Sequence, residues 1–347
     1  MTLMQQEILQ TTAVLSLSQN KNYNELKAIS EKVQKCGITN IIVAARGSSL
    51  NAGFILKNLI ETSMPNLSVG FELPSLATLY KVKRDFSKTL YVIVSQSGAS
   101  TDTINMLNES IQNGATTVAV TNDCQSVCAK TADFHIDLCA GEEKAVAATK
   151  TFTSEVFAMM LLARSINGTL ENLKMDKLIL GVEEILSDSL PKIPNDLLKA
   201  YGVMALSRGN TECVAKECGL KLMECCYKFV YAGTTNEFHH GPKALLNASQ
   251  PVILIAPSGS KGKVSNKENY IKTAQFLREL DTFIIAITDI DEISKLANLT
   301  LSLPAQEDDA EAIFATLRVQ QLVLSLSLAL GLNPDAPRNL KKVTITK

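Results

Sequence analysis

No charge of one sign dominates this chain of 347 residues, because 34 Lys and Arg residues nearly balance 35 Asp and Glu residues. Such a neutral, interspersed pattern disfavours a nucleic-acid or membrane-surface role. No segment approaches the ~18–20 uninterrupted apolar residues of a membrane span. Residues 1–10 also lack the basic stretch and apolar core of a signal peptide. We therefore expect a cytoplasmic protein that binds neither nucleic acid nor membrane.

The eight cysteines lack the CxxC spacing of common zinc sites and redox motifs. They are scattered through a large chain, so we expect them to stay reduced in a cytosolic setting. Cys218, Cys225 and Cys226 precede His239 and His240, but these spacings fit no common zinc site. The chain also has no nucleotide-binding fingerprint. We expect no metal and no other cofactor.

A serine-rich segment, residues 95–101, directly follows the apolar run 90–94. The run is typical of a buried strand, and the apolar spacing after the serines is helical, so the segment is predicted to be a strand-to-helix turn. Helix N-termini expose unpaired backbone N–H groups and favour anions. Serine and threonine are also common caps and turn residues, so one such turn alone is more often structural. As a binding site, the turn would suit a phosphorylated sugar.

A second turn of the same kind strengthens the prediction of a phosphate site. The apolar run 40–45 ends in Arg46, Gly47, Ser48 and Ser49, and an apolar-faced helix pattern follows. If the two strands are neighbours in one sheet, both hydroxyl-rich turns converge on one ligand.

The chain contains an internal repeat that sets its predicted architecture. Residues 43–48 resemble residues 205–210, and three further strand patterns recur in order at a nearly constant offset: 92–94 as 253–255, 117–121 as 284–288, and 134–138 as 299–303. Each half therefore reads as four strands alternating with helices, which implies a parallel sheet covered on both faces.

The predicted fold class is α/β, with two tandem doubly wound three-layer αβα sandwiches, parallel sheets and an extended C-terminal tail. Ligands of such folds lie beyond the carboxyl ends of the strands, where the strand order switches. The predicted segments are an N-terminal helix at 1–20, a first domain at 21–166, a linker helix at 167–195, a second domain at 196–330 and the tail at 331–347.

Four segments together resemble the signature segments of sugar isomerase (SIS) domain proteins: 46–49, 95–98, 142–150 and 237–242. Their order and spacing, together with the ending 337–342, resemble the isomerase half of glucosamine-6-phosphate synthase. They also resemble the stand-alone glucosamine-6-phosphate deaminases with two SIS domains, to which residues 140–150 are an especially close match. The resemblance covers nearly the whole chain.

The chain departs from the synthase pattern in two respects. The printed sequence shows no glutaminase domain before the first SIS half, so we expect an enzyme without glutamine-derived ammonia. Arg46 and Ala99 stand where the synthase has Cys and Glu, which puts the sugar contacts at those two positions in question.

Moving a carbonyl between C1 and C2 of a phosphosugar requires ring opening, a general base that returns its proton to the next carbon, and polar donors. Glu217, Lys221 and Glu224 follow i, i+4, i+7 spacing and share one helix face. An anonymous face of this kind is more often a solvated set of ion pairs. The resemblance implies that Glu224 transfers the proton, that Glu217 supports it in the sugar site and that Lys221 lies beside the sugar.

The resemblance also assigns a histidine and a tail lysine to the reaction. His240 matches the family's ring-opening histidine, which reaches the active site of the adjacent subunit, so a homodimer is implied. Lys342 matches a lysine that approaches the carbonyl of the open-chain sugar, in a tail that lies over the active site. We expect His239 and His135 to have no chemical role.

The remaining site residues are also implied by resemblance. Phosphate would be bound by Ser49, Ser95, Gln96, Ser97 and Ser100, and the sugar by Gly47, Ser48, Val146, Ala147 and Ala148. The corresponding turns of the second half, 208–210 and 257–259, carry fewer hydroxyls, so we interpret them as having lost phosphate binding.

The leading hypothesis is a phosphosugar isomerase or deaminase whose substrate is a phosphorylated amino sugar. Specifically, we expect a glucosamine-6-phosphate deaminase that yields fructose 6-phosphate and ammonia. Open alternatives are another SIS phosphosugar isomerase, a fructosamine-6-phosphate deglycase, and a non-catalytic phosphosugar sensor. A sensor would not need Glu224, His240 and Lys342 together.

Overall fold

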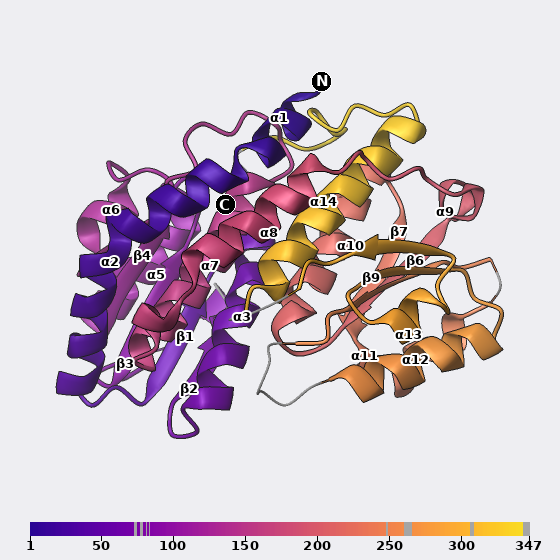
Figure 1. The fold of residues 1–347 in the computed structure, drawn as a ribbon. Coiled ribbons are helices and arrows are strands. Elements are labelled where there is room, and N and C mark those ends of the chain that lie inside the picture. The colour runs from indigo at the N-terminus through magenta and orange to yellow at the C-terminus, as the bar shows by residue number, and fades with distance from the viewer. Residues whose placement is uncertain are drawn as a thin grey trace. The chain divides into compact units, whose positions relative to one another are not determined.

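The computed structural model describes residues 1–72, 75–76, 79–80, 82, 84–247, 249–259, 266–305 and 309–342. The chain forms two compact units, each built around one sheet (Figure 1). The first unit comprises residues 10–143 and 150–173 and the chain from 341 onward. The second unit comprises residues 1–9, 144–149 and 174–340. The chain therefore crosses between the units several times.

The first unit contains a five-stranded parallel sheet in the order β2-β1-β3-β4-β5. Its strands are β1 (Asn40–Ala44), β2 (Ser68–Phe71), β3 (Thr89–Val94), β4 (Thr116–Thr121) and β5 (Phe134–Asp137). Every residue of β3 and β4 is buried, as their continuous apolar sequences predict for central parallel strands.

Helices cover both faces of this sheet. On one face α7, which is buried along its whole length, packs against α2 and α3. On the other face α5 and α6 enclose a core that includes Tyr91, Ile93 and Met106. The helices are α2 (Thr11–Lys35), α3 (Gly47–Ser63), α5 (Thr101–Gln112), α6 (Val127–Thr131) and α7 (Lys150–Ile166), with a short 3-10 helix η1 (Leu170–Asn172).

The second unit repeats this topology in its own parallel sheet, with strand order β10-β9-β8-β6-β7. Its strands are β6 (Gly202–Ser207), β7 (Phe229–Thr234), β8 (Val252–Ala256), β9 (Ile284–Thr288) and β10 (Leu299–Ser302). In both sheets the second strand in sequence lies at an edge and the first and third strands are neighbours, which matches the doubly wound 2-1-3-4-5 order.

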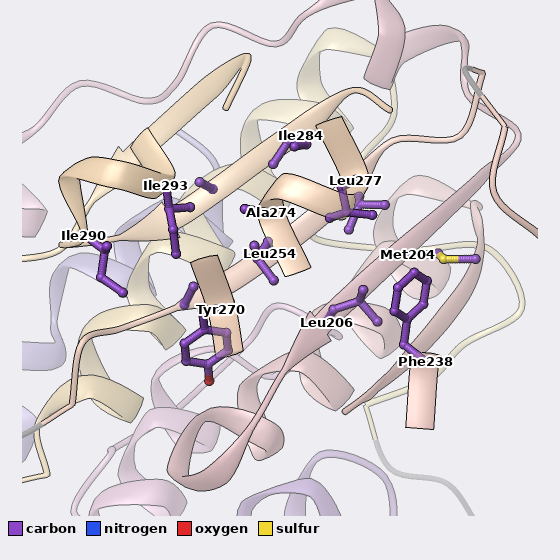
Figure 2. Close-up of a cluster of buried hydrophobic side chains, with 13 residues drawn as sticks. Met204, Leu206, Phe238, Leu254, Tyr270, Ala274, Leu277, Ile284, Ile290 and Ile293 are labelled. Carbon is purple, nitrogen blue, oxygen red and sulfur yellow. The ribbon is translucent and has the colours of Figure 1, made fainter. Parts of the chain in front are cut away.

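One face of the second sheet carries α10, which packs between the sheet and α14. The other face carries α11, α12 and α13 over a cluster of buried side chains in which Phe238 lies beside Met204 and Leu206 (Figure 2). The helices of this unit are α1 (Leu3–Leu9), α8 (Met175–Ser187), α9 (Asn195–Lys199), α10 (Glu212–Cys226), α11 (Thr235–His239), α12 (Lys267–Glu279), α13 (Asp291–Ser294) and α14 (Glu311–Ala329), with 3-10 helices η2 (Gly209–Thr211) and η3 (Pro242–Leu245).

The predicted fold class is confirmed, but the predicted number of strands per half was wrong. The sequence predicted four strands in each half, and each sheet has a fifth strand, β2 or β7. Both lie at a sheet edge and are only partly buried, and neither is among the four recurring sequence patterns that revealed the other strands.

The helices at the predicted segment boundaries also differ from the sequence prediction. Residues 1–20 do not form one helix, because α1 ends at Leu9 and α2 runs from Thr11 to Lys35. Within 167–195, the long helix is limited to α8, since residues 188–194 form no helix. The tail is free of helix and strand over its described part, residues 331–342.

The helix α14 is long and apolar enough to cross a membrane by length and composition alone. Within its most apolar window, 89% of the residues are buried inside the protein. This is the pattern of a core helix, and α14 packs against α8 and α10 in the second unit.

Candidate functional site

The two hydroxyl-rich turns of the first unit lie at the same edge of one sheet. Strands β1 and β3 are hydrogen-bonded neighbours, with Ala44 opposite Ile93, so residues 46–49 and 95–101 leave the sheet side by side. Strand order reverses between these two strands, and this is the position where doubly wound folds bind ligands. The condition set by the sequence for convergence of the turns is therefore met.

The turn after β3 is held in its shape by Gly98. Its φ of +55° is in the left-handed region, and an added Cβ would lie 2.3 Å from Ser126 Oγ. The Gly98 N–H donates to the carbonyl oxygen of Ser95 (3.1 Å), and the Ala99 N–H donates to Ser97 Oγ (3.4 Å). A residue with a side chain at position 98 would displace the serines that precede α5.

An ion pair joins the two turns at their rim. Arg46, the residue before α3, contacts the carboxylate of Asp102 in the first turn of α5, with Nη2 to Oδ2 at 2.9 Å. The Arg46 side chain is 57% exposed, so it can turn toward an anion bound between the turns.

The hydroxyl of Ser49, one of the predicted phosphate ligands, already has an acceptor. Ser49 Oγ donates to Oε1 of Glu155 (2.7 Å), a buried carboxylate on α7. A hydroxyl that donates to a carboxylate cannot donate the same proton to phosphate. Ser49 would therefore serve an anion through its backbone N–H in the first turn of α3.

The corresponding turn of the second unit is occupied by a carboxylate of the chain itself. Asp289, just after β9, accepts the backbone N–H of Ser258 (2.7 Å) and its hydroxyl (2.5 Å). These are the groups that a phosphate would need. The contact supports the interpretation that the second half has lost phosphate binding.

Glu217, Lys221 and Glu224 meet on one face of α10, as their spacing predicted, and we call them the ion cluster. Lys221 Nζ lies 3.4 Å from Oε1 of Glu217 and donates a short hydrogen bond to Oε2 of Glu224. Lys221 is 1% exposed and Glu217 is 2% exposed, so the expectation of a solvated face does not hold here. Glu224 keeps 21% of its side chain accessible.

The ion cluster keeps Lys221 charged in spite of its burial. Burial alone would lower the pKa of Lys221, but the negative charges of Glu217 and Glu224 outweigh it and raise this pKa above its ordinary value. A buried ion pair is not an efficient way to stabilise a helix, because removing the charges of Lys221 and Glu217 from water costs several kcal/mol each. Perturbed, buried charges of this kind are typical of functional sites.

The predicted sugar-binding residues Val146, Ala147 and Ala148 lie in a segment we call the sugar loop, residues 144–149. Glu7 of α1, itself buried, accepts the backbone N–H groups of Lys144 and Ala145. The Val146 N–H donates to the carbonyl oxygen of Asp335 (3.0 Å). Gln320 of α14 donates to the Thr149 carbonyl (2.9 Å). The loop is thus fixed by three other segments of the second unit.

The predicted tail lysine, Lys342, contacts a buried acid in the first unit. Lys342 Nζ lies 2.7 Å from Oε2 of Glu143, which also accepts the hydroxyl (2.6 Å) and the N–H (3.1 Å) of Thr151. Burial alone would raise the pKa of Glu143, but Lys342 and Thr151 outweigh it and hold this pKa below its ordinary range. Lys342, rather than Lys341, therefore has a defined place in the structure.

His240 follows α11 at the carboxyl end of β7 and is exposed. Its neighbour His239 packs edge-on against Phe276, with ring centroids 5.5 Å apart. His135 lies in β5, with Nε2 at 2.9 Å from the Thr121 hydroxyl, and burial lowers its pKa. These contacts account for His239 and His135 as packing residues and leave His240 open to a ligand or partner.

The geometry of α10 separates Glu224 from His240 within one chain. Helix α10 crosses back over the sheet between the parallel strands β6 and β7, so Glu224 lies near the start of β7 and His240 beyond its end. The six residues of β7 span about 20 Å at ~3.3 Å each. The two side chains are therefore about a strand length apart.

Sequence reasoning missed four residues that support the predicted site, namely Glu7, Glu143, Glu155 and Asp335. Glu143 belongs to the segment 142–150 that resembles the family, but its partner Lys342 is 199 residues away. Glu155 and Asp335 likewise act on residues more than 100 positions distant. One sequence carries no spacing signal for such pairs.

Among the residues that the structure describes, no group of three His, Cys, Asp or Glu side chains is placed to hold a metal ion. All eight cysteines are free thiols. Burial raises the pKa of Cys128 and Cys139 to about 11, so both are protonated near neutral pH.

The chain belongs to the SIS domain family, whose model matches residues 34–165 and again residues 197–330. The two matches coincide with the two sheets and their helices. The resemblance inferred from the sequence motifs is confirmed at this level.

Individual relatives agree with the family assignment. An isomerizing glutamine–fructose-6-phosphate aminotransferase from Thermococcus kodakarensis is 28% identical over 337 residues, which cover 93% of this chain and 55% of the relative. The chain thus spans about half the length of the curated relatives it matches.

Two solved structures share the fold. The C-terminal domain of a glucosamine-fructose-6-phosphate aminotransferase from Francisella tularensis superposes with a TM-score of 0.82 at 22% identity, covering 97% of this chain and 98% of that one. A glucosamine-6-phosphate deaminase from Thermotoga maritima gives a TM-score of 0.73 at 20% identity, covering 96% and 100%. Both likenesses concern the fold.

Proposed function

We propose that this protein is a phosphosugar isomerase of the SIS family. The observation that carries the proposal is the buried ion cluster of Glu217, Lys221 and Glu224 on α10. A protein that needed only a stable helix would gain little from three charges at that position. The hydroxyl-rich turns at the switch point of the first sheet supply the matching anion site.

In the proposed reaction each group has a role that its contacts allow. The turns after β1 and β3, with Ser95, Gln96, Ser97 and Ser100, bind the phosphate of the substrate, and the sugar loop contacts the sugar. Lys221 donates to one oxygen of Glu224, which leaves the other oxygen to take the proton from one carbon and return it to the next.

The specific activity that we propose is deamination of glucosamine 6-phosphate. The C1–O5 bond of the ring opens, Glu224 moves a proton from C2 to C1, and the imine formed at C2 is hydrolysed by water. Ammonia and fructose 6-phosphate result. The close match of residues 140–150 to SIS deaminases supports this choice, and Lys342 would approach the open-chain carbonyl.

We further propose a homodimer in which His240 acts in the neighbouring active site. The separation of Glu224 and His240 by about a strand length supports this arrangement, because one substrate could not contact both within a single chain. Mixing an inactive Glu224→Gln chain with an inactive His240→Ala chain should then restore activity, since mixed dimers contain one site with both residues intact. Failure to restore any activity would rule out a shared site.

The remaining assignments follow from the same proposal. Residues 21–166 would form the phosphate-binding domain and residues 196–330 the catalytic domain, joined by 167–195, with 1–20 at the N-terminus and the tail 331–347 over the active site. We propose a cytoplasmic enzyme that requires no cofactor and binds neither nucleic acid nor membrane.

The proposal is tested by ammonia release from the purified protein with glucosamine 6-phosphate. Release is expected to fall at least 1,000-fold, the order of magnitude of a lost general base, in Glu224→Gln. Glu212→Gln is the matched control, because Glu212 lies on the same helix, pairs with Lys216 and is 20% exposed, against 21% for Glu224. The control should retain full activity.

Each other outcome selects an alternative or rejects the proposal. Release from galactosamine 6-phosphate instead would identify a different epimer, and turnover of a fructosamine 6-phosphate would identify a deglycase. Tight binding of phosphosugars without turnover of any would leave a sensor and would refute the isomerase proposal.

A further inference from the structure

The tail after α14 is guided by fixed backbone features before it reaches Lys342. Gly331, with φ of +70°, ends α14 in a left-handed turn, and the Leu332 N–H donates to the Ser327 carbonyl (2.9 Å). Pro334 and Pro337 are both buried. A proline has a fixed φ, so two buried prolines restrict the path of this short segment.

Asp335 joins the tail to two other segments of the second unit. Its carboxylate accepts the first N–H groups of α1, from Leu3 and Met4, both at 2.8 Å. Its carbonyl accepts the Val146 N–H from the sugar loop. An acidic side chain at a helix N-terminus also interacts favourably with the helix dipole. The tail is therefore anchored before it passes the catalytic helix.

A second anchor lies three residues further on, and it is attached to α10 itself. The guanidinium carbon of Arg338 lies 4.1 Å from the ring centroid of Tyr227, and the backbone N–H of Arg338 donates to the Tyr227 hydroxyl (2.9 Å). Tyr227 caps α10 in a left-handed conformation, with its N–H donating to Leu222, and follows Glu224 by three residues. One side chain thus connects the catalytic helix with the tail.

The distance along the chain from this anchor to Lys342 is short. Lys342 follows Arg338 by four positions, and four extended residues reach at most about 14 Å. Asn339, with φ of +61°, turns the chain between them. Fixing Arg338 therefore limits the volume that the Lys342 ammonium group can sample.

We propose that Tyr227 and Arg338 form a latch that positions Lys342 for the reaction. This inference deepens the proposed function and rests on it for the role of Lys342. Tyr227 is a positioning residue, because it acts on the reaction through the tail. Loss of the latch is expected to leave the proposed phosphate site intact and to detach the tail from α10.

The latch is tested first by limited trypsin digestion, which requires no catalytic activity. Trypsin can cut after Lys341 and Lys342, and intact-mass spectrometry reports the shortened chain. In Tyr227→Leu, which removes both the cation–π contact and the hydroxyl acceptor, tail cleavage is expected to be about tenfold faster. Tyr227→Phe keeps the ring and should accelerate cleavage by less than about threefold. Tyr201→Leu, which removes an exposed tyrosine that stacks on Phe229, is the matched control.

A second readout is the division of the effect between kcat and KM. If the latch positions Lys342, Tyr227→Leu should lower kcat about tenfold with KM nearly unchanged. Tyr227→Phe should retain most of the wild-type kcat. Arg338→Gln removes the cation–π contact but keeps the backbone N–H bond to the Tyr227 hydroxyl, so it should lower kcat by less than Tyr227→Leu. Arg278→Gln on α12 should match the wild type. Hydrogen exchange of α10 should stay unchanged in all four variants.

The two proposals fail in distinguishable ways. If the wild type turns over no phosphosugar but Tyr227→Leu still frees the tail, the latch stands and the proposed function fails. If the wild type is active and Tyr227→Leu changes neither tail cleavage nor kcat, the latch is refuted. Faster exchange throughout α10 would also refute it, because Tyr227 would then be a simple cap of the helix.

Discussion

Replacing Lys221 by methionine tests how much stability the protein loses when the buried carboxylate of Glu217 is deprived of the Lys221 charge. Methionine has a similar length and no charge, so the variant leaves Glu217 buried beside Glu224 without its cation. Breaking a buried pair in this way costs about 3–5 kcal/mol. Because the pKa of Lys221 is raised, its stabilising charge is fully present below its ordinary value near 10.4 and is lost only as pH rises through the higher folded value. A measurement at pH 7 therefore captures the whole effect.

Lys216→Met provides the matched control on the same helix. Lys216 also pairs with a glutamate four residues before it, Glu212, but the side chains are 29% and 20% exposed and the contact is 3.6 Å. Partly exposed pairs of this kind contribute about 0.3–0.5 kcal/mol. The two variants thus differ in burial and not in residue type.

The assay must report on α10 alone, because the protein has two units and no tryptophan whose fluorescence could follow unfolding. Hydrogen exchange of α10 peptides meets this need. At ~1.36 kcal/mol per tenfold change, Lys221→Met should exchange about 10²–10⁴ times faster, and Lys216→Met about twofold faster. Adding Glu217→Gln to Lys221→Met should recover much of the loss.

The reasoning is refuted if Lys221→Met exchanges no faster than Lys216→Met, since the cluster would then carry no buried charge. It is also refuted if Glu217→Gln fails to recover protection in the Lys221→Met background.

Three further predictions concern the other parts of the site. Gly98→Ala should weaken phosphosugar binding at least tenfold in calorimetry, because the added Cβ would meet Ser126. Gly141→Ala is the control: Gly141 has a similar φ but nothing within 4 Å of the added Cβ, so this variant should bind normally. Equal affinities of the two variants would contradict the role of Gly98. The pKa of Glu143 is depressed in the folded protein, so its charge contributes stability above its ordinary pKa near 4.3. This contribution is lost as the pH falls through the lower pKa of the folded protein. Hydrogen exchange of residues 143–151 should therefore rise below about pH 4 in the wild type but not in Glu143→Gln. Calorimetry should give one phosphosugar per chain, since Asp289 occupies the second turn, and two per chain would show that the second turn is open.

The fold could be predicted from the sequence where burial leaves a pattern. Strands β3 and β4 are buried on both faces, and their continuous apolar sequences were sufficient to place them. The internal repeat extended the same prediction to β8 and β9. Strands β2 and β7 were not found in this way, because both are partly exposed edge strands whose sequences are not among the recurring patterns.

The candidate site was predictable where it is local and not where it is assembled from distant segments. Spacing placed Glu217, Lys221 and Glu224 on one helix face, but nothing in the helix itself shows that α14 and the sheet bury that face. The hydroxyls of the Ser49 turn were visible in the sequence. The carboxylate that accepts the hydrogen bond from the Ser49 hydroxyl was not visible, because Glu155 is 106 residues away.

The two halves share one topology and differ in what their switch points hold. In the first half, Arg46 and Asp102 form an ion pair at the rim of the proposed anion site. In the second half, Asp289 takes the N–H and the hydroxyl of Ser258, so a carboxylate of the chain stands where an anion would bind. A buried N–H needs some acceptor, and a permanent internal one closes the site while satisfying it. In the proposed function the second half binds no phosphate at its strand ends, and its proposed catalytic residues lie along α10. Duplication followed by this closure accounts for a protein with two similar sheets and one proposed phosphate site.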